Sequence, residues 1–263
     1  MSRPIGLIVG TGVDSVQLLS DASLSSIKTP FGDVSYVRGS MGDVDVCLLK
    51  RHGEGHVVPP HLINYRANIM ALYMLGVEKV VTTSAVGSLK QSLVPGSYAL
   101  MDGFLDFTKM RAQTFFEVGK VVHTDMTHPY SAAITEVLAT AMSALGLSLH
   151  TGEVYVAAEG PRFESPQEVR MYATMGGSVV GMTGLPEVTL AREAGLEYQT
   201  IAIITNYAAG ISASLLTHKE VLDAMAAASA SLIEVLRRSL LHIAQLPVGQ
   251  RDDEYPLDFL LNS

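Results

Sequence analysis

Charged and polar side chains gather at two turns within residues 159–187. Arg162 and Glu164 follow the first turn, Gly160-Pro161, and the second turn begins at Thr183. In open α/β sheets, ligands bind at the turns that join strands to helices. A guanidinium, a carboxylate and a hydroxyl at such turns could bind an anion or a polar small molecule, although ordinary connections with capping residues would show the same pattern.

A basic cluster, Lys50-Arg51-His52, follows the apolar segment 44–49, and glycines come after it. The guanidinium of arginine offers a planar fork of N–H donors that fits phosphate, so this cluster predicts either an oxyanion site or a solvated loop. His52 and His56 could also be metal ligands, but no convincing third ligand is near them in the sequence.

The third candidate is the turn Gly10-Thr11-Gly12, which ends the apolar run 4–9. A dinucleotide-binding fingerprint would need a third glycine where Ser15 stands, so the match to that motif is poor. Two interpretations remain. The segment is a plain turn, or its backbone N–H groups and the Thr11 hydroxyl meet an anion.

Strands and helices alternate along the chain, and these elements must position the candidate groups. Apolar or β-branched runs predict strands, and amphipathic stretches bounded by caps or glycines predict helices. The expected strands are residues 4–9, 33–42, 44–49, 77–83, 98–107, 148–158, 178–182 and 198–204, and the expected helices are residues 65–75, 131–145, 166–175, a segment after Pro186, and 219–244. This alternation predicts an α/β fold in a single domain over residues 1–263, with a polar tail from about residue 247.

Composition argues against several kinds of partner. The net charge is −8, with acids and bases mixed and no basic stripe, which argues against nucleic-acid polymers. No window approaches about eighteen uninterrupted apolar residues, so no membrane span is expected. Cys47 is the only cysteine, which rules out an internal disulfide or a cysteine zinc cluster and fits a cytoplasmic protein.

Several of these segments together resemble one family. The stretch GPRFES followed by GMTGLPE resembles the trimeric purine nucleoside phosphorylases and methylthioadenosine phosphorylases, and RHGEGH and NYRAN resemble the methylthioadenosine branch in particular. The resemblance spans most of the chain. It implies a central mixed, partly barrel-like β-sheet flanked by helices, a homotrimer, and inorganic phosphate as co-substrate. It also implies a reaction that needs neither a metal nor an organic cofactor.

The resemblance also implies roles for individual residues. The groups expected to bind phosphate are Thr11, Arg51, His52, Thr183 and the Ala85 backbone, the last in a strand-end loop at residues 84–89. The groups expected at the sugar are Met182 against the ribose, His218 near the 5′-hydroxyl, and His123 reaching across a subunit boundary to the 5′ end. Glu54 departs from the family pattern and could weaken the local positive field.

The base site is expected at Glu164 and Asn206, the two predicted catalytic residues. Methylthioadenosine phosphorylases show Asp-Tyr-Asp where this chain has Asn206-Tyr207-Ala208, whereas the nucleoside phosphorylases have Asn and Glu at the positions of Asn206 and Glu164. A 6-oxopurine carries an N1–H that suits a carboxylate, and its O6 and N7 suit an amide. Adenine has no proton on N1, and mismatched buried polar groups discriminate strongly. Hypoxanthine and guanine nucleosides are therefore the expected substrates.

Other functions remain open from the sequence. His218 favours inosine and guanosine, while the general likeness to the methylthioadenosine branch keeps S-methyl-5′-thioinosine as the alternative and methylthioadenosine as the third choice. A nucleoside hydrolase would work without phosphate, and a purine-binding protein would show no turnover. The expected phosphate donors Thr11, Arg51, His52 and Thr183 argue against both.

Overall fold

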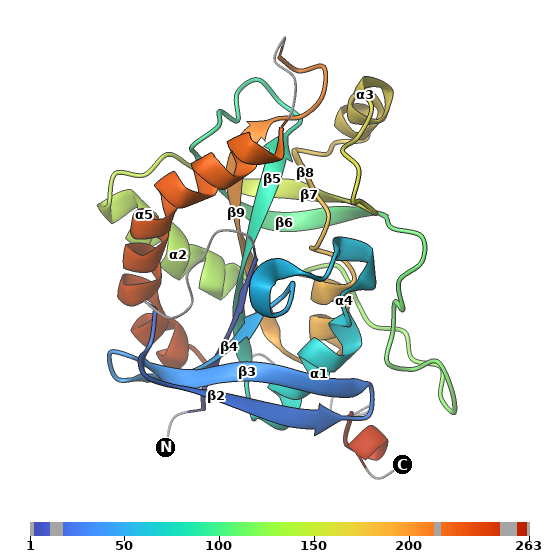
Figure 1. Ribbon diagram of the computed structural model, residues 1–263, viewed down its shortest axis with the longest axis vertical. Helices are drawn as coiled ribbons and strands as arrows, with labels where there is room; N and C mark the ends of the chain where they lie inside the picture. The colour runs from blue at the N-terminus through green and yellow to red at the C-terminus, as the bar shows by residue number, and fades with distance from the viewer. Residues whose placement is uncertain (1–2, 11–17, 213–216, 248–256, 262–263) are drawn as a thin grey trace.

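The computed structural model describes residues 3–10, 18–212, 217–247 and 257–261, which form a mixed α/β fold (Figure 1). The strands are β1 (Ile5–Val9), β2 (Ser20–Thr29), β3 (Gly32–Met41), β4 (Val44–Lys50), β5 (Lys79–Ser88), β6 (Tyr98–Phe107), β7 (Leu149–Ala158), β8 (Val179–Gly181) and β9 (Glu197–Tyr207). The helices are α1 (Tyr65–Met74), α2 (Ala132–Ala144), α3 (Pro166–Thr174), α4 (Glu187–Glu193) and α5 (His218–Gln245). Each strand and helix expected from the sequence is present.

The strands form one sheet in the order β2-β3-β4-β1-β5-β8-β7-β6-β9, and β9 also pairs with β5. This last pairing closes β5, β8, β7, β6 and β9 into a barrel-like ring, from which β1, β4, β3 and β2 extend as an open sheet. Parallel pairs such as β1–β5 and β5–β9 occur beside antiparallel pairs such as β3–β4 and β6–β9. The predicted mixed, partly barrel-like sheet is therefore confirmed.

Strand β5 belongs to both the ring and the open sheet, and it changes partner along its length. On one side it pairs with β9 from Lys79 to Ser88. On the other side it pairs with β1 at residues 79–82 and with β8 at residues 87–88. Within the described part of the chain, positions 83–86 have a paired strand on one side only. The Arg51 side chain bonds the Thr83 carbonyl at this opening at 2.9 Å, and backbone groups there that have no partner are available to a ligand.

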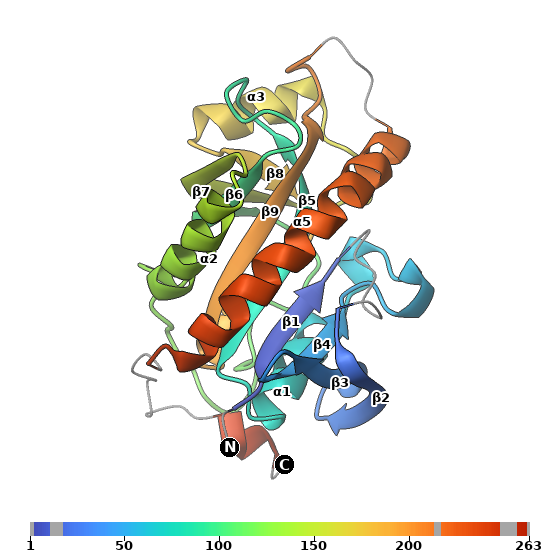
Figure 2. The ribbon, with the colours of Figure 1, turned by 90° about the vertical axis from the view of Figure 1, so that its left-hand side faces the viewer.

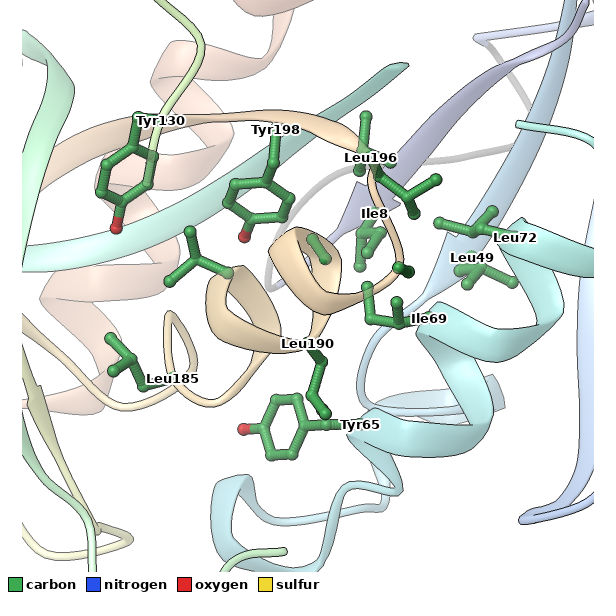
Figure 3. Close-up of a cluster of buried hydrophobic side chains, with 14 of the residues drawn as sticks. Ile8, Leu49, Tyr65, Ile69, Leu72, Tyr130, Leu185, Leu190, Leu196 and Tyr198 are labelled. Carbon is green, nitrogen blue, oxygen red and sulfur yellow. The ribbon is translucent and has the colours of Figure 1, made fainter. Parts of the chain in front are cut away.

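Helices cover both faces of the sheet, which explains why β1 and β4 are almost entirely buried and apolar. Leu7 and Val9 of β1 face a buried cluster that includes α2 and α5, whereas Ile8 faces a second cluster that includes α1 and α4. Figure 2 shows α5 running along the first face beside β9. In the second cluster, Leu190 of α4 points toward Tyr65 of α1 (Figure 3).

Helix α3 begins at Pro166 after a capping box, as the sequence predicts. The Ser165 hydroxyl accepts a hydrogen bond from the Glu168 N–H at 3.3 Å, and the Glu168 carboxylate accepts one from the Ser165 N–H at 2.8 Å. Such reciprocal bonds satisfy two N–H groups that a helix start leaves unpaired. Because Glu164 directly precedes the cap, this arrangement also fixes the chain on which Glu164 is carried.

Two polar segments expected to be loops are strands instead. Residues 84–88 continue β5, and residues 205–207 continue β9. Their small polar side chains are accommodated because they find partners inside the ring; the Thr205 hydroxyl, for example, shares its proton between the Asn206 amide oxygen at 2.8 Å and the Val86 carbonyl at 3.2 Å. Strand β2 was not expected at all. It is rich in serine and largely exposed, so it lacks the apolar pattern that identifies a strand.

Part of the C-terminal tail packs on the chain's own core. Leu257 is buried, the Asp258 carboxylate accepts a hydrogen bond from the Tyr73 hydroxyl at 2.8 Å, and the Phe259 ring stacks on Phe116 with centroids 5.9 Å apart. The sequence left open whether the polar tail is loose or packs on a neighbouring molecule, and the structure instead places residues 257–261 against α1 of the same chain. None of the described helices combines the length and the apolar character needed to cross a membrane.

Candidate active site

A cavity of about 570 Å³ lies where the opening in β5 meets the ends of β8 and β9. The predicted site residues that line it are Arg51, His52, Ala85, Glu164, Met182, Thr183 and Asn206. Gly10, at the end of β1, also lines it. The fold therefore brings Gly10, the basic cluster and the turns of residues 159–187 to one place, although the basic cluster and Glu159 are more than a hundred residues apart along the chain.

Three predicted residues are not placed in this lining. Thr11 lies outside the described residues, as does the side chain of His218, although His218 itself is the first residue of α5. His123 is exposed in the irregular segment between β6 and α2 and does not line the cavity. Its expected contact is in the site of a neighbouring subunit, so that role stays a prediction.

Arg51 is held by a buried ion pair with Glu187, the first residue of α4. The two side chains are 2% and 0% exposed. The Nε and Nη2 atoms of Arg51 donate to the two carboxylate oxygens at 2.7 and 2.8 Å. The Tyr198 and Thr82 hydroxyls also donate to Glu187, at 2.7 and 3.2 Å. Burial would lower the pKa of Arg51, but the Glu187 carboxylate more than offsets this and raises it above its usual value.

This ion pair changes what Arg51 can offer to an anion. Its planar fork faces Glu187, its Nη2 also bonds the Thr82 hydroxyl, and its Nη1 donates to the Thr83 carbonyl at 2.9 Å. Of the five N–H groups, one on Nη1 is left without a partner among the described residues. The bidentate contact with phosphate that the sequence suggested is therefore replaced by a bidentate contact with Glu187. Arg51 can still contribute a single, firmly positioned donor.

The other two residues of the basic cluster, Lys50 and His52, add little positive charge to the site. Lys50 Nζ lies 2.8 Å from the Glu54 carboxylate, so Glu54 does reduce the local positive charge. Burial lowers the pKa of His52 to about 4, and the charge of Arg51 contributes to this shift. His52 Nδ1 lies 2.8 Å from the Val58 carbonyl oxygen, so the neutral ring donates its proton there and presents Nε2 as an acceptor.

The buried, neutral state of His52 predicts that the fold loses stability as the pH falls from about 6.5 to about 4. An unfolded histidine binds a proton below about 6.5, whereas the folded chain does so only near 4. The unfolded state therefore binds more protons in this window, which removes up to roughly 3 kcal/mol of unfolding free energy by pH 4. Urea unfolding across this pH range measures the effect.

A pair of histidine variants isolates this contribution. His52→Asn should lose that part of the pH dependence, while His242→Asn, in the exposed last turn of α5, should keep it. The same dependence in His52→Asn as in the wild type would show that another group is responsible.

Glu164 and Asn206 contribute polar groups to the cavity wall. Glu164 is 8% exposed, and burial raises its pKa. Its Oε1 has no hydrogen-bond partner within the described chain. The Asn206 amide accepts from the Thr205 hydroxyl at 2.8 Å and donates to the Tyr207 carbonyl at 2.9 Å, which leaves a second amide N–H to donate. The wall thus presents a buried acceptor and a fixed donor.

Met182 is positioned by a close approach to the chain before Glu164. Gly160 has φ +68°, and a Cβ built there would lie 2.6 Å from the Met182 sulfur. Only glycine combines this backbone conformation with the space that the methionine occupies. The Gly-Pro turn recognised in the sequence is therefore shaped around a cavity residue that directly follows β8.

Arg111 ties together the two loops that carry these residues. Its Nη2 donates to the Glu159 and Ala158 carbonyls at 2.8 and 3.3 Å, and its Nη1 donates to the Leu185 carbonyl and to the Tyr65 hydroxyl. The first two carbonyls precede the loop that leads to Glu164, and Leu185 follows the loop of Thr183. One buried guanidinium therefore sets the separation of the two loops.

Sequence reasoning missed several residues of this arrangement. They are Ser84 and Phe163, which line the cavity, and Tyr155, Glu187 and Arg111, which hold the groups that do. Glu187 stands inside the GLPE motif and was visible as an acid in the first turn of a helix, but that pattern also fits simple capping. Among the described residues, no group of three or more His, Cys, Asp or Glu side chains could hold a metal ion.

Comparison with known proteins gives a consistent result. Residues 4–241 match the model of the Phosphorylase superfamily. A protein of Dictyoglomus turgidum, named "Probable 6-oxopurine nucleoside phosphorylase", is 48% identical over 223 residues, covering 84% of each chain. A protein of Methanothermobacter thermautotrophicus, named "Probable S-methyl-5'-thioinosine phosphorylase", is 44% identical over 88% of this chain and 81% of its own.

A solved structure is similar over nearly the whole chain. Methylthioadenosine phosphorylase from Schistosoma mansoni, in complex with adenine, superposes with a TM-score of 0.88 at 32% identity and covers 93% of both chains. The sequence relatives named for 6-oxopurine substrates are thus more similar to this chain than the structural neighbour that holds adenine.

Proposed function

Since the chain belongs to the Phosphorylase superfamily, we propose that it cleaves 6-oxopurine nucleosides with inorganic phosphate. The products are the free base and ribose 1-phosphate, and the reaction serves purine salvage. The enzyme is a pentosyltransferase, because its relatives at 44–48% identity are named as nucleoside phosphorylases. Inosine and guanosine are the proposed substrates.

The observation that carries the choice of base is the Glu164 carboxylate. One of its oxygens is buried in the cavity wall without a partner among the described residues, and a buried acceptor of this kind calls for a donor from the ligand. The N1–H of a 6-oxopurine is such a donor, whereas N1 of adenine is an acceptor. The free N–H of Asn206 suits O6 or N7 of the same ring.

These groups fit the chemistry of phosphorolysis. The bond from C1′ to N9 breaks as phosphate bonds to C1′, and the electron pair of the broken bond passes to the purine. A donor at O6 or N7, the role proposed for Asn206, stabilises that charge. Thr11, Arg51, His52, Thr183 and the Ala85 backbone are the proposed phosphate contacts, which hold the nucleophile against the sugar. The proposed reaction uses no metal or organic cofactor.

S-methyl-5′-thioinosine is the second candidate substrate, and one observation favours it. The cavity wall includes a run of apolar side chains, formed by Val57, Val58, Pro59 and Pro60, together with Val221 of α5. A methylthio group could bury apolar surface there, whereas a 5′-hydroxyl needs a polar partner such as the proposed His218. Met182 remains the proposed ribose contact in either case.

The substrate assignment predicts the outcome of a small matrix of assays. Release of free base is measured from inosine, S-methyl-5′-thioinosine and methylthioadenosine, each with and without phosphate. The two 6-oxo substrates should be cleaved only with phosphate, and methylthioadenosine at least about a hundredfold more slowly. The ratio of the rates for inosine and S-methyl-5′-thioinosine decides the preference at the 5′ position.

Each other outcome of these assays would indicate a different function or a different base preference. Efficient cleavage of methylthioadenosine would mean that the base-site argument is wrong. Cleavage without phosphate would identify a hydrolase, and saturable binding without turnover would identify a purine-binding protein.

A homotrimer in the cytoplasm is also part of the proposal. The segment that carries His123 exposes Met110, Val118 and Val121, each more than 80% exposed in the single chain. Exposed apolar residues that gather on one segment are typical of an interface. A stable monomer in sedimentation would remove the basis for the role of His123 at a neighbouring site.

A further inference from the structure

The hydroxyl of Tyr155 lies at the centre of a buried group of polar atoms beneath the cavity. Tyr155 belongs to β7 and is fully buried. Its Oη is 3.3 Å from the Thr183 nitrogen, 3.3 Å from the Gly184 nitrogen and 3.1 Å from Ser84 Oγ. Ser84 and Thr183 both line the cavity, so Tyr155 connects two parts of its wall without lining it itself.

Counting donors and acceptors fixes the direction of these hydrogen bonds. The Thr183 and Gly184 nitrogens are main-chain donors, so the Tyr155 oxygen accepts from both. With its lone pairs occupied, the phenol uses its own proton to donate to Ser84 Oγ. Ser84 therefore acts as an acceptor toward Tyr155, and its proton is directed to the cavity. This chain of bonds makes Ser84 a donor toward whatever ligand lies there.

Two glycines, Gly181 and Gly184, leave the space that the ring and hydroxyl of Tyr155 occupy. A Cβ added at Gly184 would lie 2.7 Å from the ring, and one added at Gly181 would collide with the hydroxyl. Both glycines belong to the segment that leads from β8 into the Thr183 loop. Side chains are thus absent at two positions where they would displace the phenol, which indicates that its position matters beyond filling volume.

We propose that Tyr155 is a positioning residue for phosphate binding. It orients the Ser84 hydroxyl as a donor toward a phosphate oxygen at the opening in β5. The inference rests on the proposed phosphorolysis. Tyr155 does not touch substrate, so its effect is on the Michaelis constant for phosphate, transmitted through Ser84.

The test begins with Tyr155→Phe, which keeps the ring and removes only the hydroxyl. The KM for phosphate should rise about tenfold, because the loss of an oriented bond to a charged group has roughly that effect. The KM for inosine and kcat at saturating phosphate should change little. Tyr130→Phe is the matched control. Tyr130 is also buried, and its hydroxyl has no partner among the described residues, so the KM of Tyr130→Phe for phosphate should match that of the wild type.

A double-mutant cycle separates positioning from simple loosening of the core. Ser84→Ala alone should also raise the KM for phosphate about tenfold, and Tyr155→Phe should add much less than another tenfold in the Ser84→Ala background. Independent effects that multiply to about a hundredfold would overturn the proposal, as would an unchanged KM in Tyr155→Phe.

Two further outcomes are distinguishable. If Tyr155→Phe does not fold, Ser84→Ala alone still decides, because an unchanged KM for phosphate in that variant would remove the donor that the proposal requires. If the wild type itself shows no phosphate-dependent cleavage, the proposed function fails and not merely the role of Tyr155.

Discussion

A Glu187→Ala variant is expected to lose roughly 3 to 5 kcal/mol of unfolding free energy, which lowers its Tm by about 10 °C. The substitution leaves the Arg51 guanidinium buried at 3% exposure without its carboxylate. It also removes the acceptor for the Tyr198 and Thr82 hydroxyls. Removing one partner of a buried pair costs far more than the pair contributes as a whole, because the remaining charge stays desolvated.

The same variant should lose activity for a separate reason. Without Glu187, the orientation of Arg51 is no longer fixed, so the single donor that Arg51 presents to phosphate is no longer held in place. Replacing both residues, as in Arg51→Met with Glu187→Ala, should restore much of the stability, since an apolar pair carries no unpaired charge. It should not restore phosphate-dependent turnover.

Calorimetric unfolding and a phosphate titration measure the two effects. The control is Glu234→Ala, which breaks the exposed pair with Arg238 on α5 and should cost less than about 1 kcal/mol. A Glu187→Ala protein as stable as Glu234→Ala would mean that Arg51 finds another partner. Recovered turnover in the double variant would show that Arg51 has no role at phosphate.

Replacement of Glu164 by alanine is expected to lower kcat/KM for inosine by about a hundredfold. The change removes the buried carboxylate that is proposed to accept from the N1–H, and a hydrogen bond to a charged group is worth about 1.5 to 3 kcal/mol. Cleavage of methylthioadenosine should not fall, because its N1 gains nothing from a carboxylate. The ratio of the two activities therefore reports the base contact directly.

The pH profile gives a second measure of the same contact. Burial raises the pKa of Glu164, and the ionised carboxylate accepts from N1–H more strongly than the protonated acid does. Activity on inosine should therefore fall as the pH drops through this raised pKa, and Glu164→Ala should lack that limb. Glu117→Ala, which removes a half-exposed carboxylate bound to Arg66, is the control and should behave as the wild type. Full activity in Glu164→Ala or in Asn206→Asp would contradict the assignment of the base site.

The cavity residues could be predicted because each stands in a short motif at the end of an apolar run. Glu164 and Asn206 could even be assigned to a type of base, since the choice depends on which atoms carry protons. Their supporting partners could not be predicted. Glu187 is 136 residues from Arg51, and only the closed ring brings the start of α4 to the end of β4.

The predicted ends of β5 and β9 were wrong for a related reason. Small polar residues such as Ser84 and Thr205 favour loops in isolation. Inside the ring they bond to Tyr155 and to the Val86 carbonyl, so the strands continue through them. Partners that are distant in the sequence determine the secondary structure at these positions, and the local sequence does not indicate those partners. Strand β2 was missed for a different reason: an exposed strand needs no apolar pattern, so its sequence carries no strand signal.

The one-sided pairing of β5 at positions 83–86 has an energetic consequence for the catalytic cycle. The Arg51 side chain bonds the Thr83 carbonyl at 2.9 Å, and main-chain groups in this stretch that have no partner within the chain must bond to water or to a ligand. A bound oxyanion replaces water as the hydrogen-bond acceptor of main-chain N–H groups in this stretch. Because the anion binds the native state and not the unfolded chain, its binding stabilises the fold. The ring is then hardest to open while substrates are engaged.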